Sequence, residues 1–139
     1  MGVTPCYAFL TDSSGGDNAL KVLIASRSSA ITTLLPSFIA RHEVHICHTG
    51  RDALVQLESL RPDVFILELM LPEMDGLTVL RTSQYKPAHI LALTNLVTND
   101  VIQTAIDAGV QDMILLPCSV HQIITYLDRL TETVPSPEL

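Results

Sequence analysis

The sequence predicts an α/β domain in which a parallel sheet is covered by helices on both faces. Short apolar runs alternate five times with segments whose apolar residues recur at helical spacing. The connections between these segments are short, as in folds built from right-handed strand–helix–strand units. In addition, residues 63–69 form an almost continuous apolar run, which is typical of a strand buried on both faces of a parallel sheet.

The first half of the chain supplies three of the expected strands. Val22–Ala25 is the first, and Ser28 or Ser29 can cap a helix that runs to about residue 41. Pro36 falls inside this helix, where it removes one hydrogen bond and costs roughly 3 kcal/mol unless the helix kinks. The remaining elements are a strand over 43–48, a helix over 52–60 and the third strand over 63–69.

The second half continues the alternation. A helix capped by Thr98 or Asn99 is expected to end at Gly109. The residues expected in its buried stripe are Val101, Ile102, Ala105 and Ile106. The other elements are a short helix over 77–83, strands over 89–93 and 113–116, and a last helix that begins after Ser119.

Length and composition fit one globular domain. The 139 residues are 47% hydrophobic and 17% charged, and a formal charge of −7 with two lysines argues against nucleic-acid binding by this domain. No apolar run reaches the roughly 18–20 residues that span a bilayer. The three cysteines are odd in number and widely spaced, which fits reduced thiols, so we expect a cytoplasmic location. The expected organisation is an N-terminal arm over 1–18, a domain over 19–131 and a tail over 132–139.

One carboxylate, Glu68, stands at the end of the most apolar strand. The loop after it contains the turn residues Pro72 and Asp75-Gly76. In open α/β sheets, ligands and chemistry gather at the carboxyl ends of the strands. Glu68 is therefore the first candidate for a functional residue.

The stretch from Pro62 to Gly76 resembles the third strand and following loop of the receiver domain of bacterial response regulators. The family pattern there is an aspartate, four apolar residues, the phosphorylated aspartate and a loop that ends in Pro-x-Met-Asp-Gly; here Glu68 replaces the phosphorylated aspartate. The resemblance extends over about residues 20–131. It implies a flavodoxin-like sheet with strand order 2-1-3-4-5 and a signalling role in a two-component system, without enzymatic activity.

A narrower resemblance covers Asp100–Ile102 and Ile114–Pro117 and is to the receivers of sporulation-type transcription regulators. It implies that residues 132–139 begin a linker to a transcription output domain.

The family resemblance implies five functional positions, and only one of them has the family's residue type in this sequence. The acidic pair that holds Mg²⁺ falls on Ser26 and Arg27, and the phosphoacceptor falls on Glu68. That position is Thr94, which supplies the switch hydroxyl. The lysine position falls on Leu116 and the aromatic switch position on Met113.

These replacements predict that phosphotransfer is lost. Mg²⁺ requires carboxylate and phosphate oxygens, and without Mg²⁺ and the lysine nothing neutralises the charge on a transferred phosphoryl group. We therefore expect no catalytic residue, no metal and no cofactor. Two interpretations of Glu68 remain open: a bidentate pair with Arg27 that fixes one conformation, or a relic that points to water.

Two other functions remain as alternatives. A working phosphoacceptor would need another aspartate near the strand ends, and the only candidate, Asp75, already has a role in the turn. A flavodoxin-like small-molecule domain would need a polar pocket at the loops after strands one, three and four. Cys118 near the strand ends is either a reactive thiol or a buried inert one.

Four neighbouring side chains suggest a zinc site, but their spacing argues against it. Adjacent residues of a strand point to opposite faces, so they cannot converge on one ion. Polar side chains of an edge strand explain this group better. Its members are His42, His45, Cys47 and His48.

Proteins are the expected partners. The resemblance implies a contact face made of the fourth helix, the fifth strand and the fifth helix. Val97, Ile106 and Tyr126 are expected to be exposed there and to bury against a partner protein or the mate in a symmetric homodimer. Contacts with a membrane are not expected.

Overall fold

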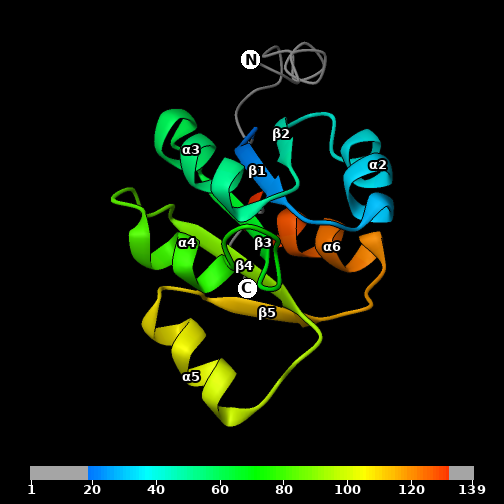
Figure 1. Ribbon diagram of the computed structural model, residues 1–139. Helices are drawn as coiled ribbons and strands as arrows, with labels where there is room; N and C mark the ends of the chain where they lie inside the picture. Colours follow the sequence, from blue (N-terminus) through cyan, green and yellow to red (C-terminus); the bar gives the residue numbers. More distant parts are fainter. Residues whose placement is uncertain (1–18, 132–139) are drawn as a thin grey trace, which may run out of the picture.

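Five parallel strands form one sheet in the order β2-β1-β3-β4-β5, which confirms the predicted fold class and strand order (Figure 1). The computed structural model describes residues 19–131, so the predicted arm and tail, including Cys6, lie outside the described residues. The strands are β1 (Lys21–Ala25), β2 (Glu43–Cys47), β3 (Val64–Glu68), β4 (His89–Thr94) and β5 (Asp112–Leu115).

Five helices lie on the two faces of this sheet (Figure 1). One face is covered by α2 (Ser29–Phe38) and α6 (Val120–Thr131), and the other by α3 (Gly50–Leu60), α4 (Gly76–Thr82) and α5 (Asn99–Asp107). Within residues 19–131, none of the helices is long and apolar enough to cross a membrane.

The core is two apolar layers, one on each side of β3. All five residues of β3 are buried, as the apolar run predicted. Alternate residues contribute to opposite layers because successive side chains of a strand point to opposite faces. Phe65 packs in the layer under α3 and α4, whereas Val64 and Ile66 pack in the layer under α2 and α6. The central strand thus fixes the position of its last residue, Glu68, from both sides.

Helix α2 ends earlier than the sequence predicted. Its last residue is Phe38, and the backbone N–H of Ile39 bonds to the carbonyl of Pro36 rather than continuing the regular pattern. Pro36 is accommodated two residues before the helix end. The extension to residue 41 was therefore wrong, but Pro36 lies inside the helix as predicted and removes one hydrogen bond near its end.

Two expectations about exposure were also wrong. Ile106 was placed in the buried stripe of α5, but it is 55% exposed, and Ala105 is the only fully buried residue of that helix. The other expectation for Ile106, that it is exposed together with Val97, is confirmed. Tyr126 was expected at the surface, but only 3% of it is exposed. Tyr126 lies three residues after the buried Ile123, so it shares the face of α6 that packs against the sheet.

The start of α3 is pressed against the loop that follows β3. The backbone N–H of Gly50 donates to the carbonyl of Pro72 at 3.0 Å. A Cβ atom at position 50 would lie 1.6 Å from the carbonyl oxygen of Met74, which no side chain can tolerate without movement of the backbone. Glycine at this position therefore lets the loop after Glu68 rest on α3.

His42 lies between α2 and β2 and is fully buried, so the description of it as a polar edge-strand residue was wrong. Its Nδ1 accepts a hydrogen bond from the backbone N–H of Leu20 at 3.0 Å, while its Nε2 has no partner among the described residues. Burial, together with the nearby Arg41 and against the opposing effect of Asp128, lowers the pKa of His42 from 6.5 to about 4. The neutral ring is the form that fits the folded chain.

We expect His42 to make the protein less stable as the pH falls from about 6.5 towards 4. In this window the unfolded chain binds a proton at His42 and the folded chain does not, so protonation favours unfolding; above the window His42 has no such effect. At about 1.4 kcal/mol per pKa unit, the free energy of unfolding falls by on the order of 2 kcal/mol near pH 5.

Urea unfolding at about pH 7 and about pH 5 measures this loss. In His42→Asn, whose side-chain oxygen can accept the Leu20 hydrogen bond, the pH dependence should be weaker than in the wild type. The exposed His121 provides the control, because His121→Asn should keep the wild-type pH dependence. Equal pH dependence in the wild type and His42→Asn would contradict the assignment.

Candidate functional site

Glu68 ends β3 at the carboxyl edge of the sheet. Strand β1 pairs with β3 so that Ala25 lies beside Leu67, which places the next residue of each strand, Ser26 and Glu68, side by side. Glu68 is 8% exposed and Ser26 is fully buried. Since Glu68 is buried, the interpretation of it as a side chain that points to water is wrong.

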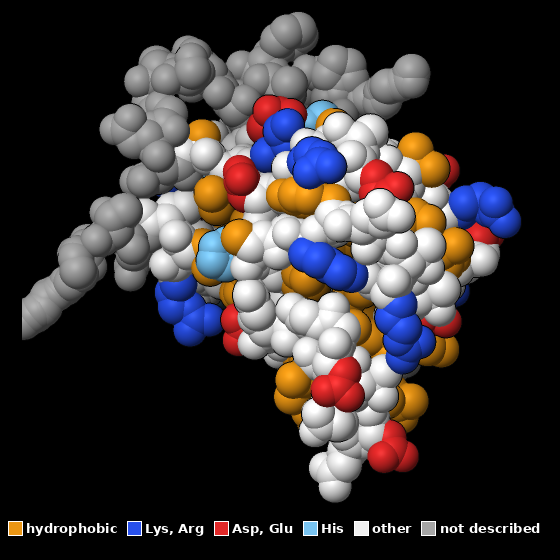
Figure 2. All heavy atoms as spheres, turned by 90° about the vertical axis from the view of Figure 1, so that its left-hand side faces the viewer, with side chains coloured by type: hydrophobic (Ala, Val, Ile, Leu, Met, Phe, Trp, Pro, Cys, Tyr) orange, Lys and Arg blue, Asp and Glu red, His pale blue; other side chains and the backbone are white. Residues whose placement is uncertain are grey.

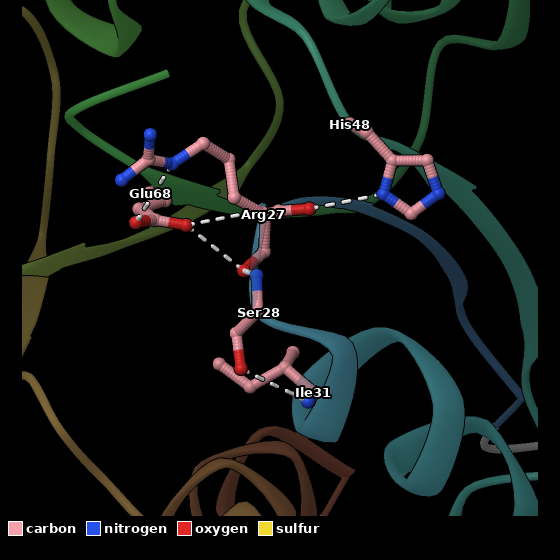
Figure 3. Close-up of polar contacts among 6 residues, drawn as sticks. Arg27, Ser28, Ile31, His48 and Glu68 are labelled. Carbon is pink, nitrogen blue, oxygen red and sulfur yellow. Dashed lines mark hydrogen bonds and ion pairs between the residues drawn. The ribbon is translucent and has the colours of Figure 1, made fainter. Parts of the chain in front are cut away.

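Two donors from the loop after β1 hold one oxygen of the Glu68 carboxylate (Figure 3). The Ser26 hydroxyl donates to Oε1 at 3.0 Å, and the backbone N–H of Arg27 donates to the same oxygen at 2.8 Å. The Ser26 Oγ in turn accepts a hydrogen bond from the backbone N–H of Ser28 at 3.0 Å. Ser28 is the residue just before α2. We call this group of Ser26, Arg27 and Glu68 the carboxylate cluster.

The Arg27 side chain contributes less than the sequence predicted. Its Nε lies 4.0 Å from Oε2 of Glu68, and the Arg27 side chain is 61% exposed, so the contact is a single long ion pair and not a bidentate one. Exposed pairs of this kind add little stability because water screens them. Sequence reasoning missed the decisive donor, the Arg27 amide, since a backbone N–H leaves no mark in the residue type.

The loop that supplies these donors is itself tied to β2. The backbone N–H of Ser26 donates to the Cys47 carbonyl at 3.2 Å. His48 Nδ1 lies 3.2 Å from the Ser26 carbonyl oxygen (Figure 3). Because a carbonyl oxygen can only accept, Nδ1 carries the hydrogen and donates it in this contact. Three strand ends are therefore joined around one carboxylate.

The other predicted positions do not join the carboxylate cluster through any hydrogen bond in the described residues. Thr94 is buried at the end of β4, where its hydroxyl accepts the backbone N–H of Leu96 at 3.0 Å and donates to the Leu96 carbonyl at 3.2 Å. Met113 is half-buried and packs against the layer under α3, α4 and α5. Leu116 is half-buried against the opposite layer and donates its backbone N–H to the Thr94 carbonyl at 2.7 Å.

The residues at the strand ends do not fit the Mg²⁺ ion that the receiver resemblance implies for this position. Glu68 supplies the only carboxylate of the cluster, and its Oε1 already accepts two hydrogen bonds. The guanidinium of Arg27 lies on the open side of that carboxylate, where it would repel a cation. A cation needs several oxygen ligands in octahedral geometry, and the cluster does not offer them.

The remaining candidates have structural roles. Asp75 caps α4 by accepting the backbone N–H of Thr78 at 2.9 Å. His45 bonds to Glu43 at 2.7 Å, and Cys47 packs in the core. In the described part of the chain, no three His, Cys, Asp or Glu side chains come close enough to hold a metal ion.

Cys118 lies in a groove of about 250 Å³ beside the start of α2. The groove is lined by Ser28, Ile31, Asn95, Leu116, Pro117 and Cys118. Burial raises the pKa of the Cys118 thiol, so the reactive thiolate is disfavoured and the inert interpretation fits better.

Comparison with known proteins gives consistent results. The sequence model of the response regulator receiver domain matches residues 22–128. The chain is similar to the transcriptional regulatory protein TrcR of Mycobacterium tuberculosis, with 29% identity over 119 residues that cover 80% of this chain and 45% of TrcR. It is 36% identical over 103 residues to protein-glutamate methylesterase/protein-glutamine glutaminase 3 of Rhodospirillum rubrum, covering 70% of this chain and 28% of that protein. It thus spans less than half the length of these two relatives.

Solved structures show the same fold. The chemotaxis response regulator CheY4 of Vibrio cholerae matches with a TM-score of 0.70 and 26% identity, over 81% of this chain and 98% of CheY4. A CheY-like receiver domain protein of Methanospirillum hungatei matches with a TM-score of 0.72 and 17% identity, over 82% and 94% of the two chains, which shows the fold alone. With its strand order and a family match over most of its length, the chain belongs to the response regulator receiver domain family.

Proposed function

We propose that this receiver domain signals without phosphotransfer and acts through protein contacts. The observation that supports this most is the occupation of the phosphoacceptor position by Glu68, whose Oε1 already accepts hydrogen bonds from Ser26 and the Arg27 amide. A carboxylate fixed in this way is a poor nucleophile towards a phosphoryl donor, and no acidic pair or lysine supports the reaction. The proposal places the domain in the cytoplasm as part of a two-component system.

Incubation with acetyl phosphate and Mg²⁺ tests the first half of the proposal. We expect mass spectrometry to show no acid-labile phosphoryl group on the intact chain, because neither Mg²⁺ nor a lysine is expected to neutralise the charge on the transferred group. A mass increase of one phosphoryl group that disappears in Glu68→Gln would refute the proposal. A combined Ser26→Asp, Arg27→Asp, Glu68→Asp and Leu116→Lys variant restores the family residues and serves as the positive control.

A fixed site should hold neighbouring loops in one conformation. Leu69, which follows Glu68, donates its backbone N–H to the Leu93 carbonyl at 2.9 Å, so the end of β3 is linked to β4 one residue before that strand ends and the β4–α5 loop at residues 95–98 begins. The carboxylate cluster can bias this loop towards one of two conformations only if its contacts differ between them. The free energy that couples two sites in this way is typically roughly 1 to 3 kcal/mol. The carboxylate cluster is proposed to supply those contacts.

Hydrogen exchange on three variants reads out this bias. Glu68→Ala and Ser26→Ala should lower protection of the Arg27 amide and of residues 94–100, with Ser26→Ala costing about 1 kcal/mol of local stability. Arg27→Ala should change protection by a few tenths of a kcal/mol, since its exposed side chain contributes little and its amide remains. Unchanged protection at residues 94–100 in Glu68→Ala means that Glu68 does not control this loop.

The contact surface is proposed to lie on α5, β5 and the loop before α5. Leu96, Val97, Ile106 and Leu115 are large apolar residues that are about half exposed or more in this region. Figure 2 shows hydrophobic side chains on both sides of the α5 region at the bottom of the molecule. A partner protein or a second copy of the chain would bury this surface.

Light scattering at high micromolar concentration tests self-association. We expect a dimer that Ile106→Ser or Leu115→Ser converts to a monomer, because each change removes apolar area from the proposed contact. Val55→Ser on α3 is the matched control, since Val55 is equally exposed but lies outside this surface. A wild-type monomer, or a dimer that only Val55→Ser disrupts, would contradict the proposal for a second copy.

A further inference from the structure

Helix α2 presents an apolar face to solvent. Leu34 is 50% exposed and Phe38 is 61% exposed, and the exposed Ala30 lies one turn before Leu34. Residues four apart lie on the same face of a helix, so these three side chains form one stripe, which we call the α2 patch. The sequence of α2 contains no charged residue, whereas the solvent face of a surface helix normally carries charged side chains. The α2 patch therefore has the character of a contact surface.

The size of the α2 patch limits what can cover it. A helix of ten residues is about 15 Å long, and three side chains on one face cover far less than the roughly 800 Å² that each partner buries in a stable complex. A separate protein or a second copy would need contacts well beyond the patch. A segment of the same chain needs less area, because its tether gives it an effective concentration in the millimolar range.

The N-terminal arm, residues 1–18, contains a segment of matching chemistry. These residues lie outside the part of the chain that the structure describes, so their sequence alone carries this step. Residues 6–10 are Cys-Tyr-Ala-Phe-Leu, a run of five apolar residues that includes two aromatic rings. Residues 11–18 are all Thr, Asp, Ser, Gly or Asn, a composition typical of linkers. The arm is thus an apolar segment joined to the domain by a polar tether.

The arm meets the domain at the edge of the sheet where α2 ends. The backbone N–H of Leu20 donates to His42 Nδ1 at 3.0 Å, and the Leu20 carbonyl accepts the backbone N–H of Glu43 at 2.9 Å. Phe38 lies four residues before His42, so the Cα atoms of these two residues are at most about 14 Å apart. Eight linker residues span up to about 28 Å, which is enough to bring the apolar segment to Phe38 and Leu34.

The other large apolar residues that are exposed in the described part of the chain are less suitable. Four of them form the surface already proposed on α5 and β5, and β5 is separated from β1 by β3 and β4. Met70 follows β3 at the carboxyl edge of the sheet, whereas Leu20 precedes β1 at the opposite edge. Val55 lies on α3, on the other face of the sheet, and α3 carries three charged residues (Figure 1).

We propose that residues 6–10 pack on the α2 patch of the same chain. Tyr7 and Phe9 are two residues apart, so an extended segment directs both rings to one side, against Leu34 and Phe38. The arm then covers the uncharged face of α2, and another protein reaches that face only when the arm is displaced. This contact goes beyond the proposed signalling function and does not depend on it, since it uses no residue of the carboxylate cluster or of the α5–β5 surface.

NMR on the intact 139-residue chain tests this contact. We expect NOEs between the rings of Tyr7 or Phe9 and the side chains of Leu34 and Phe38. A mixture of isotope-labelled and unlabelled chains shows which chain supplies the segment, and spectra filtered for contacts between chains should lack these NOEs. Absence of NOEs between residues 6–10 and α2 overturns the proposal. NOEs that occur only between chains identify a second copy as the occupant and overturn it as well.

Variants of the intact chain separate the contact from folding. Phe38→Ser should shift the amide signals of residues 6–10, and Phe9→Ser should shift those of residues 30–38, although the two sites are far apart in sequence. Val55→Ser is the matched control, because Val55 is 63% exposed, as much as Phe38, and its loss should leave residues 6–10 unchanged. The amide signals of β3 should stay at their wild-type positions in all three variants, because none of the changes reaches the core. Equal effects of Phe38→Ser and Val55→Ser on residues 6–10 would overturn the proposal.

Discussion

A buried carboxylate needs donors, and the need of Glu68 for them organises the carboxyl edge of this sheet. Burying a charged group without compensation is costly, so the side chain must be hydrogen-bonded where it lies. The nearest backbone is the loop after β1, which supplies the Ser26 hydroxyl and the Arg27 amide. That loop is held in turn by Cys47 and His48 at the end of β2. The position of one carboxylate therefore depends on three strand ends.

The residues at positions 26 and 27 follow from the same constraint. A carboxylate at position 26 would place a second negative group about 3 Å from Glu68, and two like charges at that distance strongly disfavour each other unless a cation lies between them. Serine removes the repulsion and adds a donor. Arg27 adds a positive charge at 4.0 Å in place of a further acid. The two replacements thus support the proposal of a site that works without a metal ion.

The sequence predicted the scaffold better than the site, and the reason is physical. Alternation and the apolar run of β3 reflect the burial of whole strands, which many residues determine together, so the predicted fold class was correct. The strand order was also correct, but the family resemblance implied it and the alternation did not. The contacts of Glu68 depend on a single backbone N–H and on the pairing of Ala25 with Leu67, which residue types do not reveal. His42 and Tyr126 were misjudged because amphipathic side chains occur both at the surface and in cores, and only packing decides between them.

The apolar layers and the polar contacts of Glu68 involve different residues, which explains how such a site can change without loss of the fold. Glu68 and Ser26 belong to neither of the two apolar layers, so they contribute little of the buried apolar area. Replacing one of them changes a few polar contacts, each worth about 1 kcal/mol, while the packing of β3 between α2 and α3 is unchanged. At these positions, a new set of donors can replace a metal-binding set at small cost in stability, provided that the carboxylate remains paired.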